Sequence, residues 1–176
     1  MTRATYLLAL GANRWGRHGS PERAVRAALT AIGGVVAVSP VIASAPMGPS
    51  IRRFANAAAV IESDEAPPVL LARLKAIERA FGRRRGRRWG ARAIDVDIIL
   101  WSGGRWVSRG LEVPHAAFRA RDFVLRPAAS IAPGWRDPVM GRTLAQLAHR
   151  LTRAVPLPRS GALVGVRSSV GRASDF

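Results

Sequence analysis

The segment from Ala93 to Trp101 constrains the fold most, because apolar and acidic residues alternate along it as Ile-Asp-Val-Asp-Ile. Successive side chains of a β-strand point to opposite faces, so Asp95 and Asp97 share one face, roughly 7 Å apart. Like charges on one face of a sheet repel, and the pair therefore needs a cation or strong hydrogen-bond donors. Mg²⁺ suits it, since Mg²⁺ binds one or two carboxylates together with substrate phosphates. The alternative is a solvated strand edge that forms a salt bridge with Arg92.

Hydrophobic periodicity predicts the other elements of the chain. Strands are expected at residues 6–10, 35–42, 54–61 and 93–101, and helices at residues 21–33, 69–81 and 143–151. Pro40 places the second strand at a sheet edge or a bulge, and Trp106 and Val107 are expected to extend a hairpin through Gly103 and Gly104. The core order βαββαβ predicts the ferredoxin-like α+β class, a mostly antiparallel sheet with helices packed on one face.

Length and composition predict one domain and no membrane segment. A chain of 176 residues fits a single core, and we expect a domain at residues 1–158 with a disordered tail at residues 159–176, where periodicity is lost. No run of apolar residues is long enough to cross a bilayer. The chain has no cysteine, so no disulfide framework is possible, and we expect a cytoplasmic protein.

Arginine dominates the charge of the chain. Lys plus Arg number 28 against 11 Asp plus Glu, for a net charge of +17, and Lys75 is the single lysine. Six arginines lie within residues 83–92, directly before the Asp95 strand. Such a run predicts a phosphate-rich ligand and, taken alone, fits a nucleic-acid-binding module equally well. Its position before two metal-binding acids favours phosphoryl transfer, and the chain has no Walker phosphate loop.

Four spaced motifs resemble those of the 6-hydroxymethyl-7,8-dihydropterin pyrophosphokinase family. RWGARAIDVDI at residues 88–98 is similar to the family signature R-W-G-P-R-x-L-D-L-D-I. LGAN at residues 10–13 resembles L-G-S-N, and APMGP at residues 45–49, followed by FANA, resembles P-P-L-G-P with aromatic-x-N-A. VPH at residues 113–115, followed by RDFVL, resembles V-P-H with R-x-F-V-L. The resemblance spans about residues 5 to 155.

The resemblance implies a diphosphotransferase that passes the β- and γ-phosphates of ATP to a pterin hydroxymethyl group. Its implied cofactor is Mg²⁺, as two ions held by Asp95 and Asp97. The implied catalytic residues are Arg83, Arg92, Asp95 and Asp97. The residues implied to bind the pterin are Ser44, Met47, Phe54, Asn56, Trp89 and Phe123. The residues implied to bind ATP are Lys75, Glu78, Arg85, Trp89, Ile98, His115 and Arg121.

The residues themselves support some of these assignments more than others. Phe54 and Phe123 are also typical of core aromatics, and His115 of a surface turn. Asn56 inside an apolar strand is more telling, because a buried amide needs partners that a heterocycle edge supplies. The usual family residue at Lys75 is Gln. ATP and a reduced hydroxymethyl pterin are thus the expected partners of a monomer that binds neither nucleic acid nor membrane.

Overall fold

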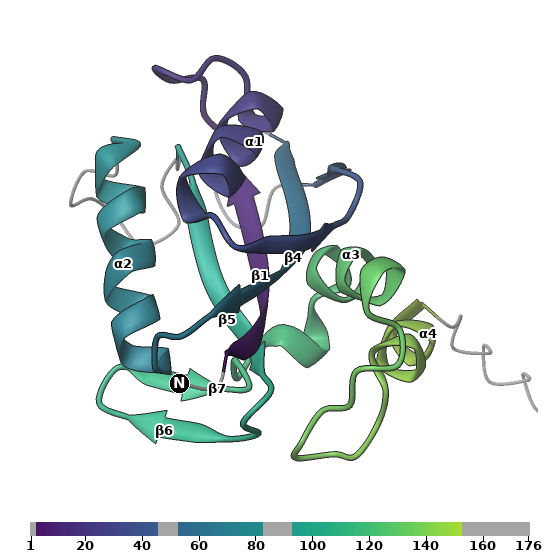
Figure 1. Cartoon of the computed structure of the whole chain (residues 1–176). Helices are drawn as coiled ribbons and strands as arrows, with labels where there is room; N and C mark the ends of the chain where they lie inside the picture. The colour runs from purple at the N-terminus through teal and green to yellow at the C-terminus, as the bar shows by residue number, and fades with distance from the viewer. Residues whose placement is uncertain (1–2, 46–52, 83–92, 153–176) are drawn as a thin grey trace, which may run out of the picture.

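The computed structural model describes residues 3–45, 53–82 and 93–152. Its main sheet has the strand order β2-β4-β1-β5, with β3 also paired to β4, and every pairing is antiparallel (Figure 1). The predicted α+β class with a mostly antiparallel sheet is confirmed. The strands are β1 (Ala4–Ala12), β2 (Val35–Val38), β3 (Ile42–Ser44), β4 (Phe54–Ser63) and β5 (Asp95–Trp101).

The strand predicted at residues 35–42 is interrupted at Pro40. β2 ends at Val38 and β3 begins at Ile42, and both pair with β4. Proline has no N–H for a ladder, and the sheet edge tolerates it. Both strands lie at the edge of the sheet, which confirms the predicted edge position, while the register shift of β2 lies between Val35 and Ala37, away from Pro40.

One face of the sheet is covered by α1 (Pro21–Ile32) and α2 (Pro67–Ala80). Alternate β1 residues, among them Tyr6, Leu8 and Leu10, enter the core beneath these helices. α1 begins as the sequence predicts, with the Ser20 side chain accepting a hydrogen bond from the Arg23 amide and Pro21 in the first turn.

The opposite face is covered too, by a second helical layer that the predicted βαββαβ core does not include. α3 (Asp122–Ile131) and α4 (Leu144–Thr152) pack there with a second core, to the right of the sheet in Figure 1. The sequence predicts α4 but not α3, which contains Pro127. An internal proline normally disfavours a helix, yet burial of Val124, Leu125 and Ala128 against this face outweighs that cost.

A small hairpin closes the bottom of the molecule in Figure 1. It pairs β6 (Trp106–Ser108) with β7 (Leu111–Val113), instead of extending β5 through Gly103 and Gly104 as predicted. An isolated bridge joins Trp101 to Gly104, and the Trp101 and Trp106 rings meet edge to face at 5.7 Å. Both tryptophans pack against the first core.

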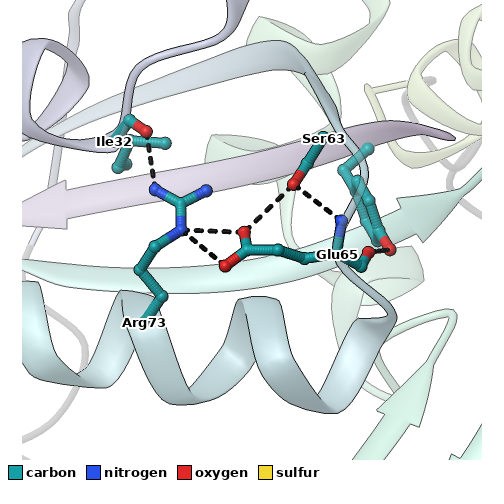
Figure 2. Close-up of polar contacts among 5 residues, drawn as sticks. Ile32, Ser63, Glu65 and Arg73 are labelled. Atoms are coloured by element: carbon teal, nitrogen blue, oxygen red, sulfur yellow. Dashed lines mark hydrogen bonds and ion pairs between the residues drawn. The ribbon is translucent and has the colours of Figure 1, made fainter. Parts of the chain in front are cut away.

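A polar network joins α1, α2 and the end of β4 (Figure 2). The Arg73 guanidinium donates from Nε to both carboxylate oxygens of Glu65, at 3.1 and 2.8 Å, and from Nη1 to the carbonyl of Ile32 at 2.6 Å. Ser63 Oγ donates to Glu65 and accepts from the Glu65 amide, and the Tyr6 hydroxyl donates to the Glu65 carbonyl. The Arg73 and Glu65 side chains at this end of the sheet are thus hydrogen-bonded to each other and to neighbouring side-chain and main-chain groups.

Candidate active site

The register of the sheet gathers polar side chains at the other end of β1. Asn56 on β4 and Asp95 on β5 both lie opposite Gly11 of β1, and Asp97 lies opposite Ala9. The neighbours Ala55, Ala57, Val96 and Ile98 enter the first core, so by alternation the polar side chains face the α3 side. The sheet therefore places the Asn56 amide and both carboxylates on one face. For Asp95 and Asp97, this shared face is what the alternating sequence predicts.

Gly11 keeps the space between these groups open. A Cβ added at Gly11 would lie 3.2 Å from Oδ1 of Asn56, which is closer than ordinary packing allows. Adjacent strands are about 4.8 Å apart, so Asn56 and Asp95 are separated by roughly 10 Å across β1. Because Gly11 has no side chain, no β1 side chain stands between them in this row of the sheet.

Asn56 is buried and oriented by β3. Its Nδ2 donates to Oγ of Ser44 at 2.8 Å, and Ser44 pairs with Phe54 in the β3–β4 register. The structure thus brings together three residues that the resemblance assigns to the pterin. The sequence did not predict that the Ser44 hydroxyl accepts a hydrogen bond from the Asn56 amide.

Arg121 directly precedes α3, and Phe123 lies in its first turn. The Arg121 guanidinium lies 5.9 Å from the centroid of the Phe123 ring, and Phe123 packs against the second core. α3 contacts β4, β1 and β3. Phe54 and Phe123 are therefore on the same side of the sheet as Asn56 and the two carboxylates, as a shared ligand site requires.

A buried ion pair fixes the segment just before Arg121. Arg119, in the 3₁₀ turn Phe118–Ala120, donates to both oxygens of the fully buried Asp137 at 2.6 and 2.8 Å. Burial works to raise the pKa of Asp137, but hydrogen bonds from Arg119 and from the Val139 amide outweigh it and lower that pKa. No motif marks this pair in an arginine-rich chain, and the sequence did not predict it.

Lys75 and Glu78 reach β5 from α2. Glu78 is fully buried and accepts hydrogen bonds from Lys75 Nζ at 2.6 Å and from the Val96 amide at 2.9 Å. Lys75 Nζ also lies 3.3 Å from the Val96 carbonyl and 3.9 Å from Oδ1 of Asp97. Their predicted contacts with ATP stay predictions, while their contacts with the carboxylate-bearing strand are a finding that the sequence did not signal.

His115 borders an open pocket beside the β6–β7 hairpin. Its amide donates to the Ile99 carbonyl at 3.1 Å, and its Nδ1 accepts from the Ala117 amide at 3.2 Å. The pocket measures about 450 Å³ and is also lined by Val107, Ser108, Gly110, Leu111, Glu112 and Ala116. The side chain of Ile98, another predicted ATP contact, lies in the first core, and its contact with ATP stays a prediction.

Several predicted site residues lie outside the described residues and stay predictions. They are Met47, Arg83, Arg85, Trp89 and Arg92. The alternative salt bridge between Arg92 and the acidic strand and the expected tail at residues 159–176 also depend on residues outside that set.

The carboxylate pair fits a metal that arrives with its substrate. Within residues 3–45, 53–82 and 93–152, no group of three or more His, Cys, Asp or Glu side chains forms a complete metal site. Mg²⁺ needs no such cage when nucleotide phosphates and water supply the remaining oxygens. In that same part of the chain, no helix is long and apolar enough to span a membrane.

Two acids and a buried amide on one face of the sheet favour the class of metal-dependent phosphotransferases. Comparison with known proteins agrees. Residues 7–133 match the family model of 7,8-dihydro-6-hydroxymethylpterin-pyrophosphokinase, and the chain belongs to this family. The predicted family is thereby confirmed.

Individual relatives carry the same name. The chain is 41% identical over 146 residues to the 2-amino-4-hydroxy-6-hydroxymethyldihydropteridine pyrophosphokinase of Pseudomonas aeruginosa, covering 80% of this chain and 87% of that protein. It is 38% identical over 108 residues to the enzyme of the same name from Synechocystis, covering 61% of this chain and 55% of that protein. The match with the Synechocystis protein thus spans little more than half of its length.

Solved structures show the same fold in a longer chain. The structure resembles Plasmodium falciparum HPPK-DHPS with a TM-score of 0.66 at 12% identity, covering 85% of this chain and 45% of that chain. At this identity the likeness concerns the fold alone. It places the sheet and its two helical layers in a known architecture.

Proposed function

We propose that this protein transfers the terminal diphosphate of ATP to the hydroxymethyl group of 6-hydroxymethyl-7,8-dihydropterin, releasing AMP and forming the pterin diphosphate ester. One observation carries the proposal most directly. Asn56 and the carboxylates of Asp95 and Asp97 face the same side of the sheet in adjacent rows, with Gly11 between them. The Asn56 end of the site suits a heterocycle, and the carboxylate end suits phosphates.

The pterin is proposed to lie between Phe54 and Phe123, with its polar edge at Asn56. The hydrogen bond from Asn56 to Ser44 fixes the direction of the amide before the ligand arrives. A preoriented amide loses less entropy on binding, and the aromatic rings suit a flat heterocycle. Met47 and Trp89 complete this proposed pocket.

The phosphates are proposed to lie over β5. Asp95 and Asp97 would hold Mg²⁺, proposed as two ions, whose chemistry is to neutralise charge on the phosphate oxygens. Arg83, Arg85, Arg92 and Arg121 are proposed to contact those oxygens through their guanidinium groups. The nucleotide is proposed to extend toward His115 and the pocket of about 450 Å³ beside it.

The reaction balances without a covalent enzyme intermediate. The hydroxymethyl oxygen forms a bond to the β-phosphorus, the bond from that phosphorus to the oxygen shared with the α-phosphate breaks, and AMP leaves with that oxygen. The hydroxyl proton passes to solvent. Alignment of the two substrates and preorganised charge around the transferred group are the main contributions of such a site, together on the order of 10 kcal/mol.

Other parts of the proposal concern the whole chain. We propose that residues 1–158 form the catalytic domain and that residues 159–176 take no part in the reaction. We also propose a cytoplasmic monomer without a nucleic-acid partner. The absence of cysteine supports the cytoplasmic assignment, because disulfide staples are common outside the cell.

The test is AMP release from ATP and Mg²⁺, measured with and without the hydroxymethyl pterin. We expect AMP to form only when the pterin is present and to stop when the metal is chelated. A protein that releases no AMP but binds RNA with a steep salt dependence would instead be the nucleic-acid-binding module that its arginine content also suits.

A further inference from the structure

Val96, the residue between the two acidic side chains, is held from outside the sheet by α2. β5 is an outer strand in the order β2-β4-β1-β5, and an outer strand leaves alternate main-chain groups without a strand partner. At Val96 the amide donates to Oε1 of Glu78 at 2.9 Å, and the carbonyl lies 3.3 Å from Nζ of Lys75. Two side chains of α2 therefore fix the backbone that connects the carboxylates.

Lys75 is shared between two carboxylates. Its Nζ lies 2.6 Å from Glu78, whose side chain is fully buried, and 3.9 Å from Oδ1 of Asp97, which is about one-third exposed. A buried carboxylate requires a compensating charge, so Glu78 keeps the ammonium in place. As a result, a positive charge is held directly beside one of the proposed metal ligands.

We propose that Lys75 and Glu78 are positioning residues that act through β5 on the metal-binding carboxylates. Glu78 anchors Val96 and the ammonium, and the charge of Lys75 lowers the affinity of the Asp95 and Asp97 pair for a divalent cation in the absence of nucleotide. The inference rests on the proposed function, because it requires that pair to bind the metal. It assigns Lys75 a task toward the protein's own acids, where Gln is the usual family residue.

Direct Mn²⁺ binding tests the charge effect without any turnover. Electron paramagnetic resonance distinguishes bound from free Mn²⁺ at fixed ionic strength. The measurement is made on the nucleotide-free protein and again after addition of a nonhydrolysable ATP analogue. We expect Lys75→Gln to tighten Mn²⁺ binding to the nucleotide-free protein on the order of three- to tenfold, since it removes a unit charge near a divalent site. Lys75→Arg, which keeps the charge, should stay within about twofold of the wild type.

A second comparison separates positioning from bulk charge. Arg79 is an exposed cation on the same helix, and Arg79→Gln should leave Mn²⁺ affinity unchanged. Glu78→Gln should weaken Mn²⁺ binding, because Lys75 then loses one carboxylate and interacts more strongly with Asp97. Opposite signs at Lys75 and Glu78 are the signature of the proposal, whereas a merely structural ion pair predicts a loss of affinity for both variants.

Each outcome decides a different claim. If Asp97→Ala binds Mn²⁺ as the wild type does, the metal assignment fails and this inference fails with it. If Asp97→Ala abolishes binding while Lys75→Gln, Lys75→Arg and Arg79→Gln all match the wild type, the proposed function stands and the role of Lys75 is refuted. Far-ultraviolet circular dichroism identifies a Glu78→Gln variant that does not fold, and the Lys75 and Arg79 variants then decide alone.

Discussion

The two ends of β1 are built from the same antiparallel pairing but treat polar groups in opposite ways. Near its start, the network around Arg73 and Glu65 joins helices α1 and α2 to the end of β4 (Figure 2). Near its end, Asn56, Asp95 and Asp97 share the face around Gly11, which has no side chain. We call these the closed end and the open end. The contacts at the closed end stabilise the fold, whereas the proposed role of the open end is ligand binding.

The largest expected effect is at the open end. Asp97→Ala should lower turnover at least about 1,000-fold, because a proposed metal ligand is lost where charge is neutralised during transfer. Its free energy of unfolding without metal should change by no more than about 0.5 kcal/mol, since the contact to Lys75 is partly exposed. AMP release and chemical denaturation provide the two measurements. If Asp97→Ala lowered the free energy of unfolding as severely as it lowered turnover, the open end would serve stability as the closed end does.

The pterin side of the open end should show a smaller effect. We expect Asn56→Ala to lower kcat/KM for the pterin by about 10- to 100-fold, which corresponds to removing one or two well-oriented hydrogen bonds. Ser44→Ala should cost less, about fivefold, because it only releases the amide that Ser44 orients. Steady-state kinetics with pterin varied at saturating ATP gives both values. Equal losses for the two variants would show that Ser44 contacts the ligand itself.

Substitutions at the closed end should lower the free energy of unfolding and leave turnover nearly unchanged. Arg73→Ala removes the hydrogen bonds to Glu65 and to the Ile32 carbonyl at the end of α1, and we expect it to cost about 2 kcal/mol of unfolding free energy. Turnover at 25 °C should remain within about twofold of the wild type. The control is Arg3→Ala, because the Arg3 ion pair with Glu62 is exposed at the same end and should contribute less than about 0.5 kcal/mol.

The open end was largely predictable from the sequence, whereas its supports were not. Alternation alone places Asp95 and Asp97 on one face, and an amide in an apolar strand singles out Asn56. The contacts of Lys75 with Val96 and Asp97 depend on how α2 meets the sheet edge, which no local pattern encodes. α3 was missed because Pro127 opposes a helix locally, while the packing that supports it comes from the opposite side of the sheet.

The smallest effect concerns Tyr6, whose hydroxyl donates to the Glu65 carbonyl at the closed end. Burial first, and the charge of Glu65 second, raise the pKa of Tyr6 above its ordinary value of 10.0. A raised pKa favours the neutral phenol in the folded state, so its contribution is complete below pH 10 and is lost as pH rises through the folded pKa. Tyr6→Phe should cost about 1 kcal/mol at pH 8, and the difference from wild type should shrink above pH 10. Denaturation between pH 8 and 11 measures this, with Trp135→Phe as a control that leaves the network intact. A difference that stays constant across that range would show that folding does not raise the pKa of Tyr6.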